Sequence, residues 1–347
     1  MTNNSIPLPS GGSTSSLTRR TIMGLAGSAM VSGAMGLGNA AAATGGRGFF
    51  TNPVIAANHP DPAVLRVGET FYLYSTSGRG RFPVLTSANM VDWTYVGSSM
   101  TGLAPWAQNG RHWAPEVIEN NGQYLMYYCA RKANSNDQAI SVAVADRPLG
   151  NFVDLRTEPL VYQQAEGGSI DASPFRDADG SLWLAWKNDG NHIGVASYLY
   201  LQRLSDDGLT LVGEAQRILG RDQEWETYTI EGPSIVLVDG VYHLIYSAGE
   251  YWNESYGVGY ATAPAITGPW TKPLDQPVLR ANAEAAGPGH GMPIKVGERW
   301  WYVYHAWEPD SIGQPPGRLV WLSQMRFTDE GLKIDAPSRK PQIRPRA

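Results

Sequence analysis

The chain has 347 residues, a formal net charge of -5 and no basic tract, which excludes the usual electrostatic signature of a nucleic-acid-binding protein. Glycine, proline, tryptophan and tyrosine are plentiful (39, 24, 12 and 17 residues), a composition that favours short strands joined by turns. The single cysteine, Cys129, excludes an internal disulfide and lies in an apolar run, so we expect a buried, inert thiol.

Residues 1–43 have the features of an export signal. Arg19 and Arg20 precede a weakly apolar stretch over 24–37 that is rich in glycine and alanine, and small residues follow at 39–43. This order is typical of a twin-arginine signal peptide, with a Sec signal or a disordered tail as the alternatives. No other apolar run approaches the ~20 residues that a membrane span needs. We therefore predict an exported protein, periplasmic or extracellular, whose mature form over 44–347 is one domain without a membrane partner.

The mature chain repeats one pattern five times. Each repeat has a short strand at a marking proline, a turn such as Asp-Gly or Asn-Gly, an alternating aromatic strand and a third strand. The aromatic strands are expected, in chain order, at 70–75, 123–128, 181–186, 241–247 and 299–305. The marking prolines, spaced by 53, 59, 59 and 60 residues, are Pro62, Pro115, Pro174, Pro233 and Pro293. Units of this length predict an all-β fold, a five-bladed β-propeller, with a β-sandwich as the alternative.

The first strand of each propeller blade lines the centre, so residues beside the marking prolines should meet at one mouth of the channel. These positions are occupied, in chain order, by Asp61, Trp113 with Glu116, Asp171, Glu231 and His290. Like charges gathered in one place raise each other's pKa values and cost stability, so their convergence indicates chemistry. One carboxyl that protonates a leaving oxygen and one that activates water are what glycoside hydrolysis needs. Each acid taken alone could instead cap a turn at a strand end.

Four motifs together resemble glycoside hydrolase family 43, and most of all its arabinanase-like members. They are His59-Pro60-Asp61-Pro62, Trp113-Ala114-Pro115-Glu116, the segment 169–175 and Glu231-Gly232-Pro233, and the resemblance covers about residues 50 to 335. The family contains arabinanases, α-L-arabinofuranosidases and β-xylosidases. The resemblance implies a five-bladed propeller and an inverting mechanism.

Carried over by motif, the resemblance implies three catalytic residues. Asp61 would be the general base that holds the water, Glu231 the general acid, and Asp171 the residue that orients the acid and raises its pKa. Inversion requires the base and acid carboxyls to lie about 6.5 to 9.5 Å apart, which leaves room for the water. Carboxyls from different blades that face one pocket can satisfy this requirement.

The resemblance also implies residues that contact the sugar. Trp113 would be a stacking wall and Arg318 would reach the sugar or the base, while core packing and a surface arginine are the respective alternatives. His59 would hold the base in place or only pack beside it. His290 matches a channel histidine that holds a structural calcium ion through water, and the alternative is a channel-lining histidine without a metal. No cofactor is required.

The leading interpretation is a secreted hydrolase of α-L-arabinofuranosyl linkages in arabinan or in arabinose-containing hemicellulose. The alternatives are a β-xylosidase acting on xylo-oligosaccharides and, from a different class, a carbohydrate-binding propeller without catalysis. The expected partner is a plant cell-wall oligo- or polysaccharide, and the expected state is a monomer. The loops 105–111 and 252–256 could close an open groove into a pocket for a chain end.

Overall fold

The structure, a computed structural model, describes residues 48–76 and 81–346. The predicted signal peptide over 1–43 lies outside the described residues. Strands dominate, and the helices of the described residues are three single turns of 3-10 helix: η1 (Gln164–Glu166), η2 (Gly190–Ile193) and η3 (Pro309–Ser311). In the part of the chain that is described, no helix is long and apolar enough to cross a membrane.

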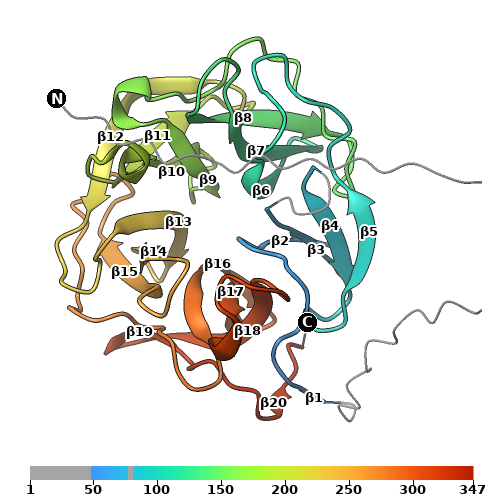
Figure 1. Cartoon of the computed structure of the whole chain (residues 1–347), viewed down its shortest axis with the longest axis vertical. Coiled ribbons are helices and arrows are strands. Elements are labelled where there is room, and N and C mark those ends of the chain that lie inside the picture. Colours follow the sequence, from blue (N-terminus) through green and yellow to red (C-terminus); the bar gives the residue numbers. More distant parts are fainter. Residues whose placement is uncertain (1–47, 77–80, 347) are drawn as a thin grey trace, which may run out of the picture. The chain divides into compact units, whose positions relative to one another are not determined.

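Five antiparallel sheets are arranged around a common centre, which confirms the predicted five-bladed propeller (Figure 1). Blade 1 contains β2 (Ala63–Val67), β3 (Thr70–Tyr74), β4 (Pro83–Ser87) and β5 (Thr94–Ser98). Blade 2 contains β6 (Trp113–Asn120), β7 (Gln123–Arg131) and β8 (Gln138–Ala145). Blade 3 contains β9 (Ser169–Arg176), β10 (Leu182–Asn188), β11 (Tyr198–Leu204) and β12 (Leu211–Gly220). Blade 4 contains β13 (Thr229–Val238), β14 (Val241–Gly249) and β15 (Gly257–Ala263). Blade 5 contains β16 (Ala286–Val296), β17 (Arg299–Trp307), β18 (Leu319–Thr328) and β19 (Gly331–Ile334).

The hairpins and the core follow from the repeated pattern. Asn121-Gly122 and Asp239-Gly240 both have positive φ at the two turn positions, which is the geometry of a tight two-residue hairpin turn. The aromatic second strands are largely buried, with side chains such as Tyr128, Tyr246 and Tyr304 packed between neighbouring blades. Each blade therefore buries its apolar faces against the next blade, and the core is divided into clusters between blades.

The innermost strands β2, β6, β9, β13 and β16 contact one another in a closed ring. Each blade also has a residue with left-handed backbone on or just before its innermost strand (Gly287 is a second one on β16), and in β6, β9, β13 and β16 the strand register shifts at that place. These residues are Asp61, Ala114, Asp171, Gly232 and His290, with φ between 42° and 59°. A bulge of this kind bends the strand and turns side chains toward the centre. The marking prolines thus predicted the repeat. The bulges explain why side chains beside these prolines point toward the centre of the propeller.

Each bulge is tied to the preceding blade through its backbone N–H. The N–H of Asp61 donates to His305 Nδ1 (3.1 Å), and that of His290 donates to Ser247 Oγ (2.8 Å). In the same way Ala114 bonds Thr76 and Gly232 bonds Asp171, while the backbone of Asp171 bonds the buried thiol of Cys129. These bonds fix the bulges relative to one another, so the side chains at the centre have defined positions.

The segment before blade 1 is bonded to blade 5 and closes the ring. β1 (Phe49–Phe50) pairs with β20 (Gln342–Ile343) in antiparallel register. The buried Asn52 side chain donates to the carbonyl of Leu322 and accepts from its N–H, both at 2.9 Å. Val54 N–H donates to the carbonyl of Val320 (2.9 Å). The amide of Asn52 therefore completes the hydrogen bonding of β18.

We predict that Asn52→Ala lowers the free energy of unfolding by about 2 kcal/mol, because both backbone groups of Leu322 lose their buried partner. Urea unfolding followed by circular dichroism measures the change. Gln216→Ala, at an exposed position of β12, is the matched control and should change stability little. Equal stability of Asn52→Ala and the wild type would contradict the role of Asn52 in closing the ring.

Candidate active site

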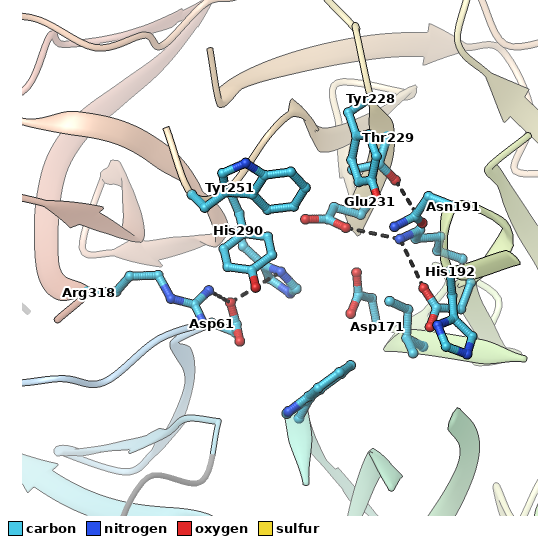
Figure 2. Close-up of a pocket in the computed structure, with 15 residues that line it drawn as sticks. Asp61, Asp171, Asn191, His192, Tyr228, Thr229, Glu231, Tyr251, His290 and Arg318 are labelled. Carbon is cyan, nitrogen blue, oxygen red and sulfur yellow. Dashed lines mark hydrogen bonds and ion pairs between the residues drawn. The ribbon is translucent and has the colours of Figure 1, made fainter. Parts of the chain in front are cut away.

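The three acidic residues predicted from the sequence face one cavity at the centre of the propeller. Asp61 precedes β2, Asp171 lies on β9 and Glu231 lies on β13, and all three line a cavity of about 310 Å³. Figure 2 shows their carboxyl groups pointing into the same space from different sides. A cavity of this size holds a small ligand rather than a polymer segment.

Asp61 is held as an ion. Its Oδ1 accepts a hydrogen bond from Arg318 Nη1 (2.8 Å), and its Oδ2 accepts one from Thr76 Oγ1 (2.5 Å). His290 Nδ1 lies 3.4 Å from Oδ1. Burial alone would raise the pKa of Asp61, but the attraction of Arg318, His290 and His305 outweighs it and holds the pKa well below its ordinary value. This carboxylate is ionised at every pH at which the protein would work.

Glu231 lies between a buried lysine and a buried tyrosine. Its Oε2 accepts a hydrogen bond from Lys187 Nζ (3.1 Å), and its Oε1 accepts one from the hydroxyl of Tyr256 (2.8 Å). The next residue, Gly232, donates its N–H to Asp171 Oδ2 (3.0 Å). Asp171 thus holds the backbone beside Glu231, and its role in orienting an acid stays a prediction.

Asp171 titrates close to neutral pH. Burial raises its pKa, the positive charge of His290 opposes this effect and the charge of Glu231 adds to it, and the net result is a pKa of about 6. His290 responds in the opposite sense: burial lowers the pKa of its imidazole, but Asp171, Asp61 and Glu231 raise it to above the ordinary value. The ionisation of Asp171 and of His290 therefore depends on the charges of the neighbouring groups in this cavity.

Lys187 is the functional candidate that sequence reasoning missed. It lies on β10 with 1 % of its side chain exposed, and its Nζ is 3.1 Å from Glu231 and 3.6 Å from Asp189. Burial lowers the pKa of this ammonium, yet the nearby carboxylates raise it above the ordinary value, so Lys187 stays charged. A signal was visible in the sequence, because Lys187 directly follows the apolar run Leu182-Trp183-Leu184-Ala185-Trp186 of an expected strand, and a buried lysine requires a partner.

Glu116 differs from the other acids. Burial raises its pKa to about 8, although the hydroxyl of Ser173 donates to its Oε2 (2.9 Å). It lies on β6 and is not among the residues that line the cavity. At neutral pH this carboxyl is protonated, and it joins blade 2 to blade 3 rather than facing a ligand.

The predicted sugar-binding residues divide into two groups. Trp113 and Arg318 line the cavity, with Arg318 bonded to Asp61, so these two predicted residues are brought together with the acids. His59 is not among the lining residues, and its Nδ1 lies 3.0 Å from Ser75 Oγ. Of the two loops expected to shape the site, 252–256 supplies the lining residue Trp252, and 105–111 supplies none.

The calcium expected at His290 stays a prediction. His290 lines the cavity, but in residues 48–76 and 81–346 no group of three or more His, Cys, Asp and Glu side chains is arranged to hold a metal ion. Calcium takes about six to eight oxygen ligands. The side chains around His290 do not provide such a set, so no step of the chemistry below depends on a metal.

Known proteins resemble this chain over nearly all of its described length. The family model described as "Glycosyl hydrolases family 43" matches residues 50–332. A β-D-galactofuranosidase of Aspergillus niger, xynD, is 26% identical over 81% of this chain and 83% of its own length. The extracellular endo-α-(1→5)-L-arabinanase 1 of Bacillus subtilis is 26% identical over 74% of this chain and 82% of its own length.

Two further comparisons concern a longer relative and a solved structure. A putative β-xylosidase of Xylanibacter ruminicola is 27% identical over 81% of this chain, but the match spans only 49% of that relative. A crystal structure of a thermostable family-43 glycoside hydrolase superposes with a TM-score of 0.78 at 33% identity, covering 86% of this chain and 99% of that one.

We predict that Lys187→Met lowers the free energy of unfolding by about 3 kcal/mol at pH 8, because the buried carboxylates around it lose their countercharge. The native variant then binds protons more strongly than the unfolded chain, so the loss should shrink as the pH falls through about 6, where Asp171 takes up a proton. Urea unfolding at pH 5.5 and 8 measures both values.

Lys333→Met, which removes an exposed ammonium 3.5 Å from Glu330, is the control for loss of a lysine charge. A Lys187→Met variant with the same stability loss at both pH values would mean that Lys187 contributes packing and not charge.

Proposed function

The chain belongs to glycosyl hydrolase family 43, and from that premise we propose that it is an inverting hydrolase of α-L-arabinofuranosyl linkages. The observation that carries the proposal is the placement of two carboxyl groups, those of Asp61 and Glu231, which face one cavity from different blades. Asp61 is surrounded by cationic and donor groups that keep it ionised, and Glu231 faces the same space beside Asp171. A fixed carboxylate and a second carboxyl across a cavity are the parts of a two-carboxyl glycosidase.

Asp61 is the general base in this proposal. Its low pKa keeps it ionised, and it accepts hydrogen bonds on both oxygens, which fixes the direction of its remaining lone pairs. A water bound to it would be oriented toward the anomeric carbon of a sugar in the cavity. The proton of that water passes to the carboxylate as the oxygen attacks.

Glu231 is the general acid, and Asp171 is the residue that positions and tunes it. Glu231 is held by Tyr256 and Lys187 from two sides, so its carboxyl has one orientation relative to the cavity. Asp171 accepts the N–H of Gly232 and carries the ionisation near pH 6. In the reaction the proton of Glu231 goes to the leaving oxygen as the C1–O bond breaks, and Asp61 takes a proton from the attacking water; after the products leave, Asp61 releases that proton to solvent and Glu231 takes one up.

The choice of arabinofuranose rests on the relatives. One is named a β-D-galactofuranosidase and another an endo-α-(1→5)-L-arabinanase, and a β-D-galactofuranoside has the ring configuration of an α-L-arabinofuranoside with one more carbon outside the ring. The size of the cavity favours a single sugar and release from a chain end. A β-xylosidase is the second candidate, because another relative bears that name.

We further propose that the substrate is plant cell-wall arabinan or arabinose-containing hemicellulose and that the protein acts outside the cytoplasm as a monomer. The name of the Bacillus arabinanase, which calls it extracellular, supports export. Aryl α-L-arabinofuranoside, β-D-galactofuranoside and β-D-xyloside, together with debranched arabinan and product sizing, test the substrate. Cleavage of the xyloside alone would favour the second candidate, and cleavage of none would favour a binding protein without catalysis.

We predict that Asp61→Asn and Glu231→Gln each lower kcat by about 10²- to 10⁴-fold on an arabino-oligosaccharide. A 4-nitrophenolate leaving group needs little protonation, so on the aryl arabinofuranoside Glu231→Gln should lose far less activity, while Asp61→Asn should lose as much as before. The two substrates therefore separate acid from base. Asp206→Asn, at an exposed position, is the control. Equal losses of Glu231→Gln on both substrates would contradict its role as acid.

We predict that Asp171→Asn removes an ionisation near pH 6 from the pH dependence of kcat/KM and lowers the rate at its optimum. Asparagine keeps an oxygen that can accept the N–H of Gly232 but cannot carry the charge. The measurement is kcat/KM from pH 4 to 8 on the aryl arabinofuranoside. An unchanged profile would show that Asp171 has no part in tuning the acid.

A further inference from the structure

Three aromatic side chains border the cavity on the side of blade 4, and we call Tyr228, Tyr251 and Trp252 the aromatic rim. All three line the cavity, and the ring of Trp252 meets those of Tyr228 and Tyr251 edge to face at centroid distances of 4.9 and 5.0 Å. Tyr251 and Trp252 are nevertheless 41% and 42% exposed. Large aromatic rings left open beside a cavity mark a binding surface, because they retain faces that a ligand can cover.

The aromatic rim is preformed. Tyr251 and Trp252 lie on the loop between β14 and β15, where the carbonyl of Tyr251 accepts a hydrogen bond from Trp307 Nε1 (2.7 Å). The guanidinium of Arg318 lies 5.0 Å from the centroid of the Tyr251 ring. The loop approaches blade 5 at Gly287, where a Cβ would come within 2.6 Å of the carbonyl oxygen of Asn253. A surface held in this way costs little ordering when a ligand binds.

The position of Glu231 indicates which part of a substrate would contact the aromatic rim. Tyr228, whose ring contacts Trp252, precedes Glu231 by three residues, and Figure 2 shows Tyr228 beside Glu231, whereas Tyr251 lies nearer to His290 and Asp61. A general acid lies next to the oxygen that it protonates, and that oxygen leaves with the departing part of the substrate. The departing part therefore extends from the cavity on the side of Glu231, which is the side of the rim.

We propose that the aromatic rim binds the sugar residue that leaves, with an apolar face of its ring stacked on Trp252. This inference rests on the proposed function, since it takes Glu231 as the acid. The sugar is a neutral one: Glu250 and Glu254 belong to the same loop as Trp252, and their charges disfavour a uronic acid there. The cavity then holds the arabinofuranose, and the rim selects for a glycan chain over a small alcohol.

The test compares two substrates that differ only in the leaving group. Methyl α-L-arabinofuranoside cannot reach the rim, whereas α-1,5-arabinotriose places a sugar on it; aryl glycosides are avoided because their own ring could stack on Trp252. For Trp252→Ala we expect kcat/KM to fall about tenfold on the triose, the size of one aromatic contact, and to stay within about twofold on the methyl glycoside. Trp252→Phe should restore part of the loss.

Tyr95→Ala, which removes an aromatic ring that is 54% exposed on β5, is the matched control and should change neither rate. Equal losses of Trp252→Ala on both substrates, or no loss on either, would overturn the proposal. If the wild type cleaves only xylosides, the sugar of the proposed function is wrong. The effect of Trp252→Ala on kcat/KM is then compared between methyl β-D-xyloside and xylotriose, with the same expected difference. If the wild type cleaves none of these glycosides, the proposed function fails and the inference that rests on it fails too.

Discussion

The burial of several carboxyl groups in one small cavity is the constraint on which this site depends. A buried carboxylate is stable only when a cation or several donors face it, and a buried carboxyl without them takes up a proton. Asp61 is ionised because Arg318 and Thr76 bond its two oxygens. Glu116, whose Oε2 accepts a hydrogen bond from the hydroxyl of Ser173, has its pKa raised to about 8 by burial. A buried carboxyl is therefore charged or neutral according to the groups that face it, as Asp61 in the cavity and Glu116 outside its lining show.

The propeller meets this constraint through its bulged inner strands. Each left-handed residue turns its neighbours toward the centre, and its N–H is held by the blade before it. In blade 5 and blade 4 the acceptors are His305 and Ser247, on the second strand of the blade. In blade 3 the second strand carries Lys187, whose ammonium cannot accept, and the N–H of Gly232 goes to Asp171 instead. Lys187 is then free to pair with Glu231. Lys187, which replaces an acceptor at this place in blade 3, therefore supplies the countercharge of Glu231. It also leaves the N–H of Gly232 to bond Asp171, which links Asp171 to the residue beside Glu231.

The sequence allowed the blades and the acids to be predicted because both follow from local pattern. Turn residues, alternating aromatics and regularly spaced prolines are visible along the chain, and Asp61, Asp171 and Glu231 lie just before three of those prolines. The countercharges were harder to predict, since the partner of Glu231 is 44 residues away and depends on how β10 packs against β13. Arg318 was found only through a family resemblance. The aromatic rim was recognised in part, because the loop holding Trp252 was expected near the site, while Tyr228 gave no signal that distinguishes a rim residue from a core residue.

Blade 5 joins the base to the aromatic rim. Arg318, just before β18, bonds Asp61 and also lies over the ring of Tyr251, and Trp307, at the end of β17, holds the backbone of that tyrosine. The guanidinium can serve both neighbours because it donates in its plane and stacks through its face. A lysine at this position would keep the charge but lose the stacking. The arginine therefore ties the orientation of Asp61, the proposed base, to the position of the loop that carries the aromatic rim.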